Sequence, residues 1–364
     1  MKVKEVAQII NDKAPFQYAE SYDNSSLQIG DPERDVTGIL CSLDCTEAII
    51  AEADQTGCNL IVCHHPVLFK GVKKLTGNTF VERTVIKALQ KDIAVIAAHT
   101  NLDNYNYGVN DIICEKLQLI NRRILLPKKN ILEKVIVFCP HEQAGDVKTA
   151  MFKAGAGSIG NYDYCSFNTI GQGTFRAGKD TNPHVGNQHE LHTENETKIE
   201  VLVEQHLVKQ VMLAMFRAHP YEEVAYDRIP LLNEHQNVGS GMFAETEEPV
   251  EAKTFLKQIK SKLKTDLVRH TAIHKPTVQK IAVCGGAGSF LLQEAIHQNA
   301  DVFITGDYKY HDFFDADRKI IIADPGHYES EQFTPELLQR LLQEKIHTFA
   351  VRISEVNTNP ISYL

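Results

Sequence analysis

The sequence predicts an α/β protein in which two related α/β halves form one core and a ferredoxin-like α+β domain is inserted between them. Near both ends of the chain, short apolar segments of strand length alternate with segments of helix length, a pattern typical of parallel sheets covered by helices. The middle of the chain has the order strand, helix, strand, strand, helix, strand, which is ferredoxin-like. At 364 residues the chain is also long for a single core, so two or three domains are expected.

The first section supplies three strands separated by two helices. We expect strands at residues 37–43, 59–63 and 93–98, and helices at residues 46–55 and 80–91. The strands contain short apolar runs such as Leu60-Ile61-Val62, which is typical of strands buried on both faces of a parallel sheet.

The final section repeats this order. We expect strands at residues 280–284, 301–304 and 319–323, and helices at residues 290–298 and in a segment that ends at 342. Cys41 lies 23 positions before His64, and Cys284 lies 23 positions before Asp307, so the strand, helix, strand unit has the same length in both sections. Internal duplication would explain this agreement. Chance would explain it equally well, because connection lengths in α/β units are narrowly distributed.

The inserted segment has a pattern of its own. We expect strands at residues 135–138, 164–167, 198–203 and 223–226, helices at 146–153 and 206–218, and an exposed hairpin or loop in the polar stretch 171–197. These boundaries divide the chain into a discontinuous core, residues 1–130 and 237–364, and an inserted domain, residues 131–236.

Composition argues against several classes of protein. The net charge of −9 disfavours a general nucleic-acid binder, and the basic stretch from Lys257 to Lys264 fits the solvated face of a helix. No apolar stretch approaches the roughly 20 residues that span a bilayer, and the N-terminal segment lacks the pattern of a signal peptide, so we expect a cytoplasmic protein without membrane partners. The eight cysteines are scattered, which favours reduced, packed thiols, with a zinc pair at Cys41 and Cys45 as the weaker alternative.

Polar segments with imidazole and carboxylate groups closely follow three of the apolar runs. The five candidate metal ligands in these segments are His64, His65, Asp103, His327 and Glu331. Side chains at the ends of buried strands lie where α/β sheets commonly bind ligands. Neutral imidazole and carboxylate suit zinc, iron, manganese or cobalt, and the absence of paired Cys-x-x-Cys motifs argues against a structural thiolate zinc site. Taken singly, the pair His64 and His65 and the pair His327 and Glu331 also fit exposed polar residues that bind no metal.

Two spacings support a shared site. His327 and Glu331 are four positions apart and would lie on the same face of a helix. Adjacent His64 and His65 point to opposite faces of an extended strand, but a turn at the strand end brings both imidazoles towards one site or two neighbouring ones. Residues beside other predicted strand ends are interpreted as hydrogen-bonding partners of a ligand or substrate, with capping and turn roles as the alternative: Asp44, His99, Asp307 and His311.

The glycine-rich segment from Cys284 to Ser289 follows a predicted strand and opens a predicted helix. Backbone N–H groups at such a position bind anions, but the segment lacks the Gly-Lys-Ser/Thr ending of a P-loop and the full dinucleotide-binding spacing. A tight turn between strand and helix is the equal alternative.

Taken together and in order, these segments resemble the motif set of the Nif-three-like family, whose members are often labelled GTP cyclohydrolase I type 2 homologues. The resemblance is carried by residues 23–30, 63–66, 99–103, 284–288, 305–307 and 326–331. It covers both outer sections, and Ser26 stands where the family has glycine, which affects only the expected shape of that loop. The segment Ala218-His219-Pro220-Tyr221-Glu222-Glu223-Val224-Ala225-Tyr226-Asp227 resembles the longer bacterial members, whose inserted domain is similar to PII and CutA proteins.

The resemblance implies a dinuclear site with two divalent metal ions per chain, of zinc, iron, manganese or cobalt. It implies that the ligands are His64, His65, Asp103, His327 and Glu331, with Glu331 bridging the two ions. It also implies a ring-shaped homohexamer whose sites face an internal cavity.

The leading hypothesis is a metal-dependent hydrolase in which the ions lower the pKa of a bound water towards about 7. The family label makes the small-molecule substrate a nucleotide and the reaction that of a GTP cyclohydrolase, in which C8 of guanine leaves as formate. The catalytic residues stay unassigned, with His99 and His311 as the alternatives for the proton donor. The alternative is a metal-binding regulatory or sensor protein without turnover, whose insert carries seven of the sixteen histidines. Among them His219, close in sequence to Glu222 and Glu223, is the one to test.

Overall fold

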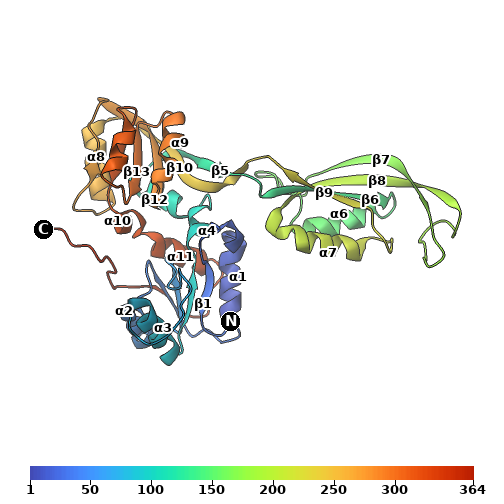
Figure 1. Cartoon of the computed structure of the whole chain (residues 1–364), viewed down its shortest axis with the longest axis horizontal. Coiled ribbons are helices and arrows are strands. Elements are labelled where there is room, and N and C mark those ends of the chain that lie inside the picture. Colours follow the sequence, from blue (N-terminus) through green and yellow to red (C-terminus); the bar gives the residue numbers. More distant parts are fainter. The chain divides into compact units, whose positions relative to one another are not determined.

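A computed structural model describes all 364 residues and divides the chain into two compact units (Figure 1). The core unit comprises Met1–Leu126 and Asn237–Leu364, and the insert comprises Pro127–Gln236. The core unit contains two sheets and the insert contains a third. The predicted mixed α/β fold class is therefore confirmed.

The first sheet of the core unit has five strands in the order β1-β4-β3-β2-β15. Their bounds are Ser26–Ile29 for β1, Ile39–Ser42 for β2, Leu60–Cys63 for β3, Ala94–Ala97 for β4 and Val351–Ile353 for β15. Strands β2, β3, β4 and β15 run parallel, and β1 pairs antiparallel with β4. Helices α2 (Glu47–Gln55) and α3 (Phe80–Gln90) begin after the capping residues Thr46 and Thr79 and pack on one face of this sheet.

The second sheet has six strands in the order β11-β14-β13-β12-β10-β5. Their bounds are Ile120–Lys128 for β5, His235–Glu251 for β10, Arg269–His270 for β11, Thr277–Ala287 for β12, Val302–Gly306 for β13 and Ile321–Asp324 for β14. Strands β12, β13 and β14 are parallel, and β11 pairs antiparallel with β14, as β1 does with β4 in the first sheet. Helix α9 (Leu292–His297) packs on one face of the sheet in a cluster with Phe303.

Four helices pack between the two sheets: α1 (Val3–Lys13), α5 (Val109–Leu117), α8 (Ala252–Lys262) and α11 (Thr334–Gln343). Their buried residues, such as Ile10, Ile113 and Phe255, share one hydrophobic cluster with the inner faces of both sheets. Burial of apolar surface stabilises by about 25 cal/mol per Å², so this cluster holds the two sheets together in one unit. Two short helices, α4 (Thr100–Asp103) and α10 (His327–Glu331), follow β4 and β14.

The insert is a four-stranded antiparallel sheet with two helices on one face (Figure 1). Its elements are β6 (Leu132–Pro140), α6 (Ala144–Lys153), β7 (Ser166–Arg176), β8 (Leu191–Glu204), α7 (Val208–Ala218) and β9 (Tyr226–Leu231). The strand order β7-β8-β6-β9 is ferredoxin-like, as the sequence predicts. Val147 and Met215 of the helices pack against Val137 and Val201 of the sheet.

The polar stretch 171–197 forms an exposed hairpin, one of the two predictions for it: residues 171–176 and 191–197 are strand, and residues 177–190 connect them. β7 and β8 remain paired from Ser166 with Val201 to Arg176 with Leu191. Most side chains of this outer part of the hairpin are exposed, so it lacks the apolar alternation of a half-buried strand.

All eight cysteines are free thiols, and seven of them are buried. Cys41 and Cys45 belong to different hydrophobic clusters, so they do not form a metal-binding pair. Burial raises the pKa of Cys45 to about 12, which keeps its thiol protonated. No helix combines the length and the apolar character that crossing a bilayer requires.

Candidate metal centre

The candidate ligands lie at the carboxyl ends of parallel strands in the core unit. Strand β3 is followed directly by His64 and His65. Strand β4 leads into α4, whose last residue is Asp103. Strand β14 leads into α10, which begins at His327 and ends at Glu331. The fold thus brings all five side chains together from distant parts of the chain.

Glu331 is shared by two groups of potential ligands. Its Oε1 atom is 3.8 Å from Nε2 of His64, which is itself 3.6 Å from Oδ1 of Asp103. Its Oε2 atom is 3.0 Å from Nε2 of His65 and 3.1 Å from Nε2 of His327. The two oxygens of one carboxylate therefore face two different sets of donors.

A sixth residue, His99, belongs to the same cluster. Its ring centroid lies 5.2 Å from that of His64 and 5.6 Å from that of His65. These three histidines form a further group of potential ligands, which does not include Glu331. His99 therefore lies beside the candidate ligands, in a position to contact whatever binds there.

Two buried atoms of the cluster have no hydrogen-bond partner, Nε2 of His64 and Oδ1 of Asp103. An unsatisfied buried polar atom costs about 1–3 kcal/mol, so two of them 3.6 Å apart point to a cation that both would coordinate. Imidazole nitrogen and carboxylate oxygen are also donors that borderline divalent metals accept. The residues therefore fit a divalent metal ion.

Every imidazole of the cluster has its Nδ1 atom fixed by an oxygen acceptor. The pairs are His64 with the carbonyl oxygen of Ala98 at 2.8 Å, and His65 with Asp44, His99 with Asp23 and His327 with Asp307, each at 2.7 Å. A proton on Nδ1 donates to the acceptor and leaves Nε2 free for a metal, as is usual for metal-binding histidines. Asp44 and Asp307 thus make the kind of contact that their positions after strands suggested.

Asp23 is the residue of this site that sequence reasoning missed. Besides holding His99, its carboxylate accepts hydrogen bonds from the hydroxyl groups of Thr100 and Ser25 at 2.6 and 2.7 Å. Burial raises the pKa of the Asp23 carboxyl, but the hydrogen bonds from His99 and Thr100 outweigh burial and hold the pKa well below its usual range. Its position at the start of the motif 23–30 was the available signal.

His311 lies apart from the cluster. It is exposed at the start of the short 3-10 helix His311–Ala316, and its ring lies 5.2 Å from that of Tyr310. No group of potential ligands includes it, so a contact with a candidate ligand is not formed, and a contact with a substrate stays a prediction.

The glycine-rich end of β12 packs against Glu331. Gly286 has a φ of +59°, and a Cβ atom at this position would lie 2.5 Å from Oε1 of Glu331. The N–H of Gly286 donates to the hydroxyl of Ser330 at 3.0 Å. The segment provides a close approach of backbone to carboxylate that only glycine allows, a role that neither sequence interpretation included.

The charges of the cluster act strongly on one another. Burial lowers the pKa of His65, but hydrogen bonds to Asp44 and Glu331 outweigh burial and raise it to about 10. Burial likewise lowers the pKa of His327, and Glu331 reverses this and raises it to about 9. Burial and the charge of Glu331 raise the pKa of Asp103 to about 7. Protons on His65 and His327 thus balance the negative charge of the carboxylates. A divalent cation would replace these protons.

The sequence of the whole chain identifies its family. The family model described as Duf34/NIF3 (NGG1p interacting factor 3) matches residues 1–360, so the chain belongs to this family. The matched range includes the core unit and the insert. The resemblance of the motifs to the Nif-three-like family is thereby confirmed.

Relatives of the chain are named GTP cyclohydrolase 1 type 2 homolog. The one from Halalkalibacterium halodurans is 36% identical over 364 residues, covering 99% of this chain and 98% of the relative. One from Staphylococcus aureus is 35% identical over 369 residues, covering 100% of both chains. Among solved structures, a Bacillus cereus protein related to NIF3 has a TM-score of 0.87 and 34% identity, with 100% of this chain and 99% of that chain covered. A Staphylococcus aureus protein has a TM-score of 0.80 and 32% identity at the same coverage.

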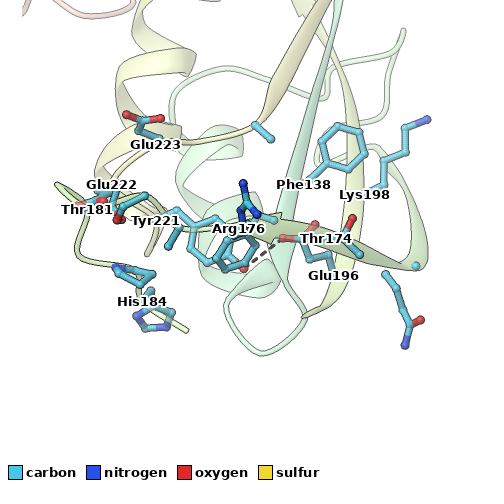
Figure 2. Close-up of a pocket in the computed structure, with 18 of the residues that line it drawn as sticks. Phe138, Thr174, Arg176, Thr181, His184, Glu196, Lys198, Tyr221, Glu222 and Glu223 are labelled. Atoms are coloured by element: carbon cyan, nitrogen blue, oxygen red, sulfur yellow. Dashed lines mark hydrogen bonds between the residues drawn. The ribbon is translucent and has the colours of Figure 1, made fainter. Parts of the chain in front are cut away.

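The insert contains a cavity of its own, of about 770 Å³ (Figure 2). In its wall, the hydroxyl of Tyr221 donates to Oε1 of Glu196 at 3.2 Å, the contact drawn as a dashed line in Figure 2. His219 forms hydrogen bonds to two residues that line the cavity. Its Nε2 donates to the carbonyl oxygen of Phe138 at 2.9 Å, and its Nδ1 accepts from the N–H of Tyr221 at 3.1 Å. Both ring nitrogens are occupied, so His219 fixes a loop and does not bind a metal ion.

Proposed function

We propose that the protein is a metal-dependent hydrolase that binds two divalent ions per chain. The proposed ligands are His64, His65, Asp103, His327 and Glu331. The observation that carries this proposal is the position of Glu331, one of whose oxygens faces His64 and Asp103 while the other faces His65 and His327. A carboxylate in this position suits a bridging ligand, and the donors suit zinc, iron, manganese or cobalt.

Bound divalent ions would supply Lewis-acid chemistry and make water a better nucleophile at neutral pH. His99 would carry a proton, because its ring lies against His64 and His65 while its Nδ1 is held by Asp23. The Asp23 carboxylate keeps a proton on Nδ1, so that Nε2 is the atom that accepts and returns a proton.

The proposed substrate is a nucleotide. Relatives named GTP cyclohydrolase 1 type 2 homolog support this class of substrate. In the proposed reaction, water adds to C8 of the guanine ring, the ring opens, and a second water releases this carbon as formate. The proposed assembly is a homohexamer, which a measurement of molar mass in solution would test.

Metal content and turnover, measured on the same preparations, test the hydrolase proposal. We expect about two ions per chain by elemental analysis in the wild type and less than about half an ion in Glu331→Gln, because the shared carboxylate is lost. Glu336→Gln is the matched control, since Glu336 forms a surface ion pair with Lys116. Formate should be released from GTP by the wild type and the control only. Turnover by metal-free Glu331→Gln protein would overturn the proposal.

A metal-binding regulator without turnover is the second candidate function. The cavity of the insert favours it, because cavities of several hundred Å³ with apolar walls and a few polar groups bind small molecules. A regulator should bind its small molecule equally well after His64→Ala, and no nucleotide should be turned over by the metal-loaded wild type. Turnover that disappears in His64→Ala would exclude this candidate.

A further inference from the structure

The loop that joins β3 to α3 begins at the candidate ligands His64 and His65, and side-chain hydrogen bonds hold both of its ends. At its start, the carbonyl oxygen of Leu68 accepts a hydrogen bond from Nδ2 of Asn24 at 2.7 Å, and the N–H of Leu68 donates to Oε1 of Gln28 at 3.1 Å. At its end, the carboxylate of Glu82 accepts hydrogen bonds from two backbone N–H groups at 2.9 and 3.1 Å. Both ends are fixed in this way, and residues 69–75 between them form what we call the basic loop.

The basic loop carries three lysines without acidic partners. Lys70, Lys73 and Lys74 are all exposed, and none of them forms an ion pair. The chain as a whole has a net charge of −9, whereas residues 69–75 contain three lysines and no acidic residue. Ammonium groups bind phosphate as hydrogen-bonding point charges, so this part of the surface suits a phosphorylated molecule.

An aromatic surface connects the basic loop to the histidines of the centre. The ring of Phe69 lies 6.1 Å from that of His99 and 6.4 Å from that of Tyr22. Phe69 is 45% exposed and Tyr22 is 65% exposed, so both rings offer a free apolar surface. A hollow of about 540 Å³ borders Phe69, the three lysines and the start of α3. Aromatic rings beside unpaired cations are the combination that binds nucleotides by stacking and charge.

We propose that the basic loop binds the nucleotide substrate, with Tyr22 and Phe69 stacking on its planar ring and Lys70, Lys73 and Lys74 holding its phosphates. This inference rests on the proposed hydrolase function, because it assigns substrate contacts to the same site. It adds the residues that recognise the substrate, none of which is a proposed metal ligand.

The order of these residues also sets the direction of the bound nucleotide. Phe69 contacts His99, and the lysines follow Phe69 in the loop. The planar ring would therefore lie beside the metal centre, and the phosphates would lie farther along the loop, at Lys70, Lys73 and Lys74. This direction presents a ring atom, and not a phosphate ester, for hydrolysis.

Two triple variants with the same change of charge test the phosphate contacts. One is Lys70→Gln with Lys73→Gln and Lys74→Gln, and the other removes three exposed lysines of α8, Lys253→Gln with Lys257→Gln and Lys260→Gln. Affinity is measured on metal-loaded protein from the fluorescence anisotropy of ribose-labelled GTP and from competition by guanosine. We expect the loop variant to bind GTP at least about tenfold more weakly than wild type and to bind guanosine with an affinity within about twofold of wild type. The α8 variant should bind GTP and guanosine with the affinities of wild type.

Phe69→Ala tests the ring contact. We expect it to weaken GTP and guanosine alike, each by at least about fivefold, with the metal content of the wild type. Equal GTP affinity of the two triple variants would overturn the inference. A loop variant that keeps its GTP affinity but changes its molar mass in solution would also overturn it, and would mark the basic loop as an interface between copies. Lysine-dependent GTP binding without any turnover would support the loop assignment while refuting the hydrolase function.

Discussion

The two halves of the core unit share one strand arrangement and use it differently. In the first half, β1 pairs antiparallel with the last of the parallel strands β2, β3 and β4, and in the second half β11 does the same with β12, β13 and β14. The first half places His64, His65 and Asp103 in the cluster, from segments that follow two neighbouring strands. The second half places His327 and Glu331 there, both from one short helix.

The positions after β3 and β13 show the difference most clearly. His64 and Asp307 each lie 23 positions after a cysteine of the preceding parallel strand. His64 is fully buried and directs Nε2 towards the cluster, whereas Asp307 is exposed and holds Nδ1 of His327. The strand arrangement therefore determines where a residue reaches the site, and the side chain determines whether it would bind a metal or orient a ligand.

The largest loss of metal should come from a substitution at the end of β12, where the backbone of Gly286 lies against Glu331. Gly286→Ala places a Cβ atom 2.5 Å from Oε1 of Glu331 and forces alanine to a φ of +59°. We expect loss of both ions by elemental analysis and a free energy of unfolding lower by about 1–3 kcal/mol in urea denaturation. Gly171→Ala is the control, because a Cβ atom there meets nothing within 4 Å. Full metal content in Gly286→Ala would contradict the central position of Glu331.

One ligand removed from each half should distinguish the two groups of donors. His64→Ala should lose the ion beside Asp103 and keep about one ion per chain, and His327→Ala should lose the ion beside His65 and keep the other. Elemental analysis counts the ions, and the absorption spectra of the cobalt-loaded variants should differ because different donors remain. Loss of both ions in both variants would show that the halves do not hold separate ions.

The orienting carboxylates offer a closer comparison of the halves. Asp44→Asn and Asp307→Asn each remove the negative charge of the group that holds a histidine Nδ1 at 2.7 Å, one in each half. We expect a 10- to 100-fold loss of metal affinity in both, measured by competition with a chelator. Asp315→Asn, an exposed carboxylate outside the cluster, is the control. An effect in only one of the two variants would mean that the halves orient their histidines by different means.

The smallest effect should come from His311. His311→Ala removes an exposed ring outside the cluster, so metal content should not change and the free energy of unfolding should change by less than about 0.5 kcal/mol. Metal analysis and urea denaturation measure both. A loss of turnover with intact metal would give the second half a proton carrier that the contacts do not show.

Burial explains what could be predicted from the sequence. Strands such as Leu60–Cys63 and Ala94–Ala97 are buried along their whole length, so their apolar residues form an uninterrupted signal. The candidate ligands were found because they follow such strands, and strand ends are where parallel sheets expose polar groups. The outer part of the β7–β8 hairpin gave no such signal, because its side chains are exposed and polar.

Long-range contacts explain what could not be predicted. Asp23 meets His99 across 76 positions of sequence, and no periodicity or spacing links two residues so far apart. The need for glycine at Gly286 arises only when α10 packs against β12 and brings Glu331 within reach. The first depends on the pairing of β1 with β4 and the second on the packing of α10 against β12, and local sequence patterns record neither.

His65 and Glu331 are 266 positions apart in the chain, yet their side chains meet at 3.0 Å. A ribosome that adds about 5–20 residues per second needs roughly 13–50 s to reach Glu331 after His65 has been made. Throughout this time the nascent chain has histidines of the cluster but not the carboxylate that they share. Metal uptake at the proposed centre would therefore follow synthesis of Glu331, and a bound ion would report that translation has passed Glu331 and that the two halves have come together.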